Sequence, residues 1–153
     1  MPRSTARLTL AALVLLVMCV SGCSRFHGAW KRAAEAPAPT SGLEGRWEGV
    51  WVSDHNGHHG RLRCLVTHQS NGVYQAWFHA KFQKIFSFAY KVPIQVEATA
   101  DGYRFHGQED LGTMAGGLYT YDGSVEGTNF FSTYKAKYDY GTFRMGRPAP
   151  SDP

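Results

Sequence analysis

The sequence predicts an all-β domain, in which about eight antiparallel strands form a single up-and-down meander that closes into a small barrel. Aromatic residues make up 14% of the 153 residues, and across residues 43–147 they alternate with β-branched and polar residues. Glycine-containing turn signals recur roughly every ten residues in this segment, and no part of it keeps apolar residues at helical spacing. A two-sheet β-sandwich is the alternative, because successive hairpins do not by themselves require closure.

The turn signals divide the domain into eight expected strands, near 45–55, 58–69, 73–82, 86–99, 103–109, 117–126, 130–137 and 141–147. Gly123 is expected either to form a bulge in the sixth strand or to split it. Eight antiparallel strands of this length close into a barrel, which removes exposed edges. The interior of such a barrel is filled by side chains or holds one small ligand.

The first hairpin is predicted from Asn56-Gly57, because both positions of a two-residue hairpin turn need positive φ. This turn places His55 opposite His58. Side chains alternate along a strand, so Trp47, Gly49 and Trp51 share the inner face. The expected pairs are Trp51 with Leu62, Gly49 with Cys64, Trp47 with Val66, Glu48 with Leu65, Val50 with Arg63 and Val52 with Arg61.

Two later hairpins have comparable signals. A three-residue loop over 70–72, with Gly72 in the left-handed conformation, pairs Cys64 with Phe78 and Val66 with Ala76. This register leaves Trp77 exposed on the outer face. A turn at Asp101-Gly102 pairs Ala98 with Phe105 and Val96 with Gly107, and it sets one inner face along the fourth strand: Phe86, Phe88, Tyr90, Val92, Ile94 and Val96.

Many large rings are therefore expected inside the barrel, among them Phe82, Phe86 and Tyr121. They either fill a narrow core or line a cavity, in which tyrosine hydroxyls would supply directed polar groups. The candidates for lining a ligand are Trp51, Tyr74, Phe78, Phe88, Tyr90, Phe105 and Tyr119.

The first 23 residues resemble a bacterial lipoprotein signal. Arg3 and Arg7 precede an apolar run over 8–20, which is shorter than the roughly 20 residues of a membrane-spanning helix, and Val20-Ser21-Gly22-Cys23 resembles a lipobox. The resemblance implies cleavage after residue 22 and acylation of Cys23, for instance by palmitate. It also implies export and a lipid anchor in the cell envelope. By analogy with known lipoproteins, Ser24 rather than an aspartate after the cysteine fits release to the outer membrane if the host has one.

This signal sets the remaining domain boundaries: a signal peptide over 1–22, a lipidated terminus and flexible tether over 23–42, the barrel over 43–147 and a disordered proline-rich tail over 148–153. Of the 16 basic and 12 acidic residues, Arg3 and Arg7 lie in the signal, and the others are mixed in sign. That pattern argues against binding of nucleic acid. Cys64 is the one thiol left, so no internal disulfide is expected, and its apolar neighbours predict an inert core thiol.

The ends of the domain resemble the calycin pattern of lipocalins, avidins and fatty-acid-binding proteins. Gly45-Arg46-Trp47 opens the first strand and residues 141–147 form the last. In those families a tryptophan of the first strand packs under an arginine of the final strand. The resemblance assigns these roles to Trp47 and Arg147, because Arg147 shares a face with Phe143 and Met145 whereas Arg144 points the other way. The chain also resembles small uncharacterised bacterial lipoproteins.

Candidates for chemistry are few. His55 and His58, expected opposite each other, are weak candidates for metal or haem ligands, although such a site needs further ligands. Glu109 and Asp110 are adjacent and point to opposite faces of a strand, and no Gly-x-Ser-x-Gly motif is present. We therefore expect no enzymatic activity and no cofactor.

Three functional hypotheses follow. The first is a membrane-anchored barrel that binds a small apolar or amphipathic molecule without transforming it. The second is a structural or interaction lipoprotein with a filled barrel, for which an exposed Trp77 is the specific indication. The third is metal or haem binding through His55 and His58. The sequence leaves the oligomeric state open.

Overall fold

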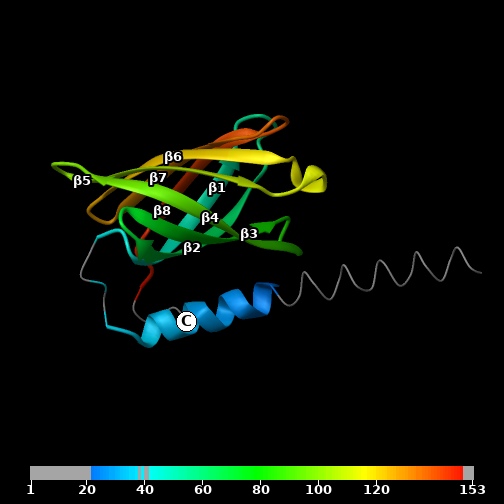
Figure 1. The fold of residues 1–153 in the computed structure, drawn as a ribbon. Helices are drawn as coiled ribbons and strands as arrows, with labels where there is room; N and C mark the ends of the chain where they lie inside the picture. The colour runs from blue at the N-terminus through cyan, green and yellow to red at the C-terminus, as the bar shows by residue number, and fades with distance from the viewer. Residues whose placement is uncertain (1–21, 38, 40–41, 150–153) are drawn as a thin grey trace, which may run out of the picture.

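The computed structural model describes residues 22–37, 39 and 42–149 and contains a closed antiparallel barrel (Figure 1). Each strand pairs with the next along the chain, and β1 pairs with β8 to close the barrel, so the sandwich alternative is wrong. A short 3-10 helix, η1 (Thr113–Ala115), connects β5 to β6. The strands are β1 (Gly45–Ser53), β2 (His59–Ser70), β3 (Val73–Phe82), β4 (Phe86–Ala98), β5 (Gly102–Asp110), β6 (Leu118–Glu126), β7 (Asn129–Lys135) and β8 (Tyr140–Gly146).

Glycines allow the strands to approach closely where the barrel closes. Gly49 faces Met145 and Gly141 faces Ser53 across the pairing of β1 with β8. A Cβ atom at Gly49 would overlap the backbone of β8, and one at Gly141 would overlap the backbone of β1. Both positions therefore exclude a side chain, because backbone atoms cannot give way as a flexible side chain can.

The β2–β3 register agrees with the prediction, whereas the β1–β2 register is shifted by two residues. Cys64 faces Phe78, as expected, but Trp47 faces Cys64 rather than Val66. The loop is longer than a two-residue turn: the Ser53 amide donates to the His58 carbonyl at 2.8 Å, which leaves residues 54–57 as the loop. His55 and His58 therefore do not face each other. A shift of two keeps every side chain on its predicted face.

The β4–β5 register is also shifted by two, since Val96 faces Phe105 and the Thr99 amide donates to Gly102. Val92 and Ile94 face the core as expected, but Phe86 and Phe88 are more than half exposed. Phe86 and Phe88 belong to the end of β4 that pairs with β3 alone. Gly123 lies in an unbroken strand and forms neither a bulge nor a turn. The ring of Phe105 occupies the space that a Cβ at Gly123 would need.

The largest departure from the prediction is a helix over residues 22–35, in the segment expected to be a featureless tether. It runs along the outside of the barrel next to β2 (Figure 1). Phe26 and Trp30 are fully buried against Leu65 of β2 and Trp77 of β3. The tether, expected over 23–42, is therefore wrong for residues 23–35, and the expectation of an exposed Trp77 is wrong because the helix covers it.

Cationic and aromatic groups surround the buried rings of this helix. The guanidinium groups of Arg46 and Arg63 lie over the Trp30 ring, with Cζ 5.1 and 4.8 Å from its centroid. Phe26 stacks on His79 with ring centroids 5.0 Å apart. Burial lowers the pKa of His79 to about 4, so the imidazole is neutral at physiological pH. A neutral imidazole can be covered by an apolar helix without burying a charge.

Among the described residues, no helix combines the length and the apolar character needed to cross a bilayer. The expected signal peptide falls almost entirely outside the described residues, as do positions 150–153 of the expected tail.

Candidate functional site

One end of the barrel is closed by Trp47 and Arg147, in the contact that the sequence predicts. The Arg147 Cζ lies 3.7 Å from the centroid of the Trp47 ring, and the indole is fully buried. The guanidinium also donates to the carbonyl oxygens of Arg46 at 3.0 Å and Gly42 at 2.7 Å. Arg144 lies on the outer face over Phe131, as the alternation of side chains predicts. We call this end the closed end.

The middle of the barrel is filled by rings. Phe78 contacts Tyr121 and Phe143 with centroid separations of 5.9 and 5.3 Å. Phe105 contacts Phe130 at 5.1 Å. Phe78 and Phe105 are buried in this packing and therefore belong to the core rather than to the wall of a cavity. Cys64 is also fully buried, and burial raises the pKa of its thiol, which keeps it protonated.

The opposite end has a different character, because its large rings are only partly buried. We call Trp51, Phe82, Tyr90 and Tyr119 the aromatic mouth, and this end the open end. Trp51 lies 6.1 Å from Phe82 between ring centroids, and its indole donates to the Lys81 carbonyl at 2.9 Å. Tyr90 lies 5.5 Å from Phe78, which places the mouth directly above the filled core. Three predicted lining residues, Trp51, Tyr90 and Tyr119, thus lie partly buried toward the same end.

Tyrosine hydroxyls form the polar part of the mouth. Burial raises the pKa of both Tyr90 and Tyr121, so both hydroxyls are neutral at physiological pH. The Tyr121 hydroxyl is buried and makes no hydrogen bond of good geometry among the described residues, and the hydroxyl of Tyr90 is close enough to act on its pKa. An unsatisfied buried hydroxyl costs about 1–3 kcal/mol. It is therefore a polar group that a bound molecule can satisfy.

The barrel wall beside Tyr90 is incomplete. Between the described strands, the β4–β5 ladder runs from Ile94–Gly107 to Ala98–Tyr103 only, so residues 86–93 of β4 pair with β3 alone. Pro93 stands where this ladder ends, and proline has no N–H to donate to a neighbouring strand. The mouth is thus bordered on one side by backbone of β4 that forms no ladder pairs with β5.

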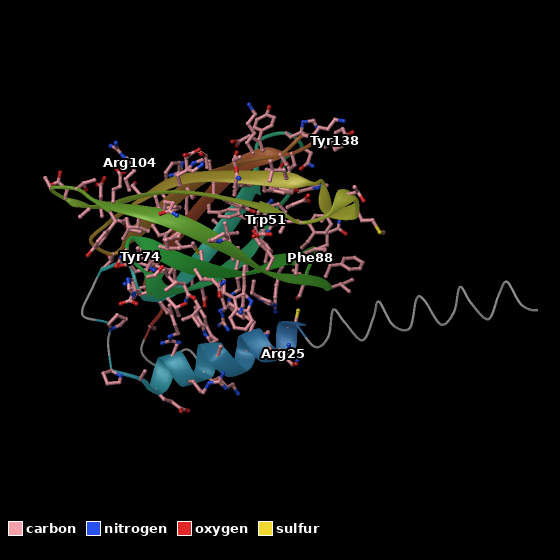
Figure 2. The ribbon with its side chains drawn as sticks, viewed as in Figure 1. Arg25, Trp51, Tyr74, Phe88, Arg104 and Tyr138 are labelled. Atoms are coloured by element: carbon pink, nitrogen blue, oxygen red, sulfur yellow. The ribbon has the colours of Figure 1, made fainter. Side chains whose placement is uncertain are left out.

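The two remaining predicted lining residues lie at different ends of the barrel (Figure 2). Phe88 is at the open end, on the same face of β4 as Tyr90, and is 55% exposed near the start of the helix. Tyr74 lies toward the opposite end, where its ring contacts His68, and therefore does not share a site with Tyr90. Sequence alternation correctly assigns Tyr74 to the inner face, but it does not say at which end of the barrel a residue lies.

The two candidate histidines at the first turn have separate surroundings. The His55 ring lies 6.0 Å from Tyr140 and the His58 ring 5.0 Å from Phe82, between centroids. Across residues 22–37, 39 and 42–149, no three His, Cys, Asp or Glu side chains gather as metal ligands.

A scan of protein-family models finds none that matches this chain, and searches of curated proteins and of solved structures return no match.

Proposed function

We propose that this chain is a lipid-anchored protein of the cell envelope that binds one end of a small apolar or amphipathic molecule in its aromatic mouth, without transforming it. The observation that carries the proposal is the buried, unsatisfied hydroxyl of Tyr121 beneath partly exposed rings. Small-molecule sites combine apolar and aromatic walls with a few directed polar groups in this way. The filled middle of the barrel limits the bound part to the open end.

The lipobox-like signal supports the anchor. Cys23 is partly exposed at the start of the described helix, and its Sγ lies 3.9 Å from the carbonyl oxygen of Ser87 in β4. An acyl chain on this thiol would project from the protein surface at the open end, beside the aromatic mouth. The calycin-like identity is supported by the barrel and by the stacking of Arg147 on Trp47.

A structural or interaction lipoprotein is the second candidate, and the continuous ring contacts of Phe78, Tyr121 and Phe143 favour it. It no longer has the support of an exposed Trp77, which the helix covers. Metal or haem binding through His55 and His58 ranks below both, because the rings contact different neighbours.

A Tyr121→Phe variant separates the first two candidates. We expect it to bind a fluorescent long-chain fatty acid about five-fold more weakly than the unchanged protein, because one neutral hydrogen bond contributes about 1 kcal/mol. Binding is measured by titration of the full chain in detergent. Tyr74→Phe, at the other end of the barrel, is the matched control and should leave the affinity unchanged. Absence of saturable binding, or equal weakening by both variants, would favour the interaction protein.

A further inference from the structure

Exposed apolar side chains gather at the open end. Among the described residues, the strongly exposed large hydrophobic side chains other than Val50 all lie on the β3–β4, β5–β6 and β7–β8 connections or at the starts of the strands that follow them, at this end. Met114, in η1, is 94% exposed, and Ile85, between β3 and β4, is 81% exposed. The others are Phe86, Phe88, Leu118, Tyr138 and Tyr140. A patch of apolar side chains on the solvent-facing surface of a protein marks an interaction surface.

The β3–β4 hairpin contributes most to this surface. Gln83 and Lys84 have φ values of 48° and 63°, a left-handed conformation that residues other than glycine rarely adopt. This turn leaves Ile85 at the tip, next to Phe86. Strain of this kind persists where the surrounding structure or the function requires it.

The charge of the hairpin fits an anionic surface. Residues 81–90 contain Lys81 and Lys84 and no acidic residue, whereas Lys91, further along β4, lies over the Trp77 ring. Arg25, on the first described turns of the helix, lies toward the same end as Phe88 (Figure 2). Basic groups beside exposed aromatic and aliphatic side chains favour the interface of a membrane that carries anionic lipids.

The helix also brings the proposed site of lipid attachment to this end, because it places Cys23 against Ser87 of the same hairpin. We propose that the open end docks on the surface of the anchoring bilayer, with Ile85, Phe86 and Phe88 inserted between anionic headgroups. The position of that bilayer rests on the proposed lipid at Cys23, whereas the apolar surface is a property of the barrel. Docking turns the aromatic mouth toward the membrane, so an amphipathic ligand can enter it from the lipid phase.

Site-directed spin labelling tests this orientation. A nitroxide is attached to Ile85→Cys or, as the matched control, to Asn71→Cys in the β2–β3 turn at the closed end. The full chain carrying its native lipid is reconstituted in vesicles of phosphatidylethanolamine and phosphatidylglycerol. We expect the ratio of collisions with oxygen to collisions with a water-soluble nickel chelate to be several-fold higher at position 85 than at 71. Equal, water-like ratios at both positions would overturn the proposal and favour a protein partner.

Two further samples make the result specific. Buried Cys64 does not react, so label on the unmutated protein reports a free thiol at Cys23, or at Cys19 in an uncleaved chain, and thus a failure of the proposed anchor rather than of docking. A label at Met114→Cys should lose its preference for oxygen when Phe86→Ser and Phe88→Ser are added, but not when Val50→Ser is added. Val50 is 47% exposed on β1 and serves as the matched apolar control. An equal response to both sets of substitutions would contradict docking through the hairpin.

Discussion

Replacing Trp47 with alanine is expected to lower the free energy of unfolding by about 3–5 kcal/mol, as deletion of a large aromatic side chain from a core does. The indole is fully buried, contacts Phe130 with centroids 5.6 Å apart, and donates to the Leu43 carbonyl at 2.9 Å. Its loss also removes the ring on which Arg147 stacks. Chemical denaturation of the full chain in detergent measures the change.

Arg144 in β8 and Arg147 directly after this strand provide the matched comparison. Arg147→Ala removes a cation–π contact and two hydrogen bonds to backbone carbonyls, so we expect it to cost about 1–3 kcal/mol. Arg144→Ala removes a group on the outer face and should stay within about 0.5 kcal/mol. If Arg144→Ala proved the more destabilising change, the assignment of Arg147 to barrel closure would be wrong.

Replacing Trp30 with alanine is expected to release the helix over 22–35 from the barrel, at a cost of about 3–5 kcal/mol in docking free energy. Trp30 is fully buried among Leu65, Trp77 and two guanidinium groups, so its removal leaves a cavity beneath a single helix. Hydrogen exchange should accelerate at the amides of residues 26–35, and the fluorescence of newly exposed Trp77 should shift to the red.

The barrel itself should survive this change, because Trp30 lies outside its interior. Amides of β6 and β7, which do not contact the helix cluster, should exchange as slowly as before. Lys31→Ala, at an exposed position of the same helix, is the control and should alter neither signal. Accelerated exchange throughout the barrel would instead show that helix and barrel unfold as one unit.

The alternation of side chains along each strand was sufficient to predict which residues face inward, but not which residues of neighbouring strands pair. Trp47 and Cys64 point inward as predicted although the β1–β2 register is shifted by two, because an even shift preserves the side-chain period. The shift itself depends on hydrogen bonds of Ser53 that lengthen the loop. Asn56-Gly57 is a strong turn signal, but it does not determine where the ladder begins.

The helix was missed because its apolar stripe is short. Phe26, Trp30 and Ala33 follow a spacing of four and three residues, which is a helical period. These three positions alone do not make a clear helical pattern beside the neighbouring alanines and prolines. Its binding surface consists of Leu65 and Trp77 on the outer face of the barrel. An outward tryptophan and leucine on neighbouring strands were therefore the available signal for a covering element.

The aromatic mouth was only partly predictable. Side-chain alternation correctly assigns Trp51, Tyr90 and Tyr119 to the inner face as lining candidates. It assigns Phe88 and Tyr74 there by the same rule. Which rings meet depends on how far each hairpin extends beyond the barrel and on the β4–β5 ladder, which ends at Ile94. Neither property follows from the period of side chains along a strand.

Native mass spectrometry of the protein purified from its host membranes is the most direct test of a lipid-anchored binder. We expect a chain that lacks residues 1–22, carries a covalent acyl mass at Cys23, and holds one non-covalent small molecule of defined mass that Tyr121→Phe retains less well. A chain that keeps residues 1–22 or carries no lipid would contradict the anchor. A lipidated chain that never carries a small molecule would contradict the binding function.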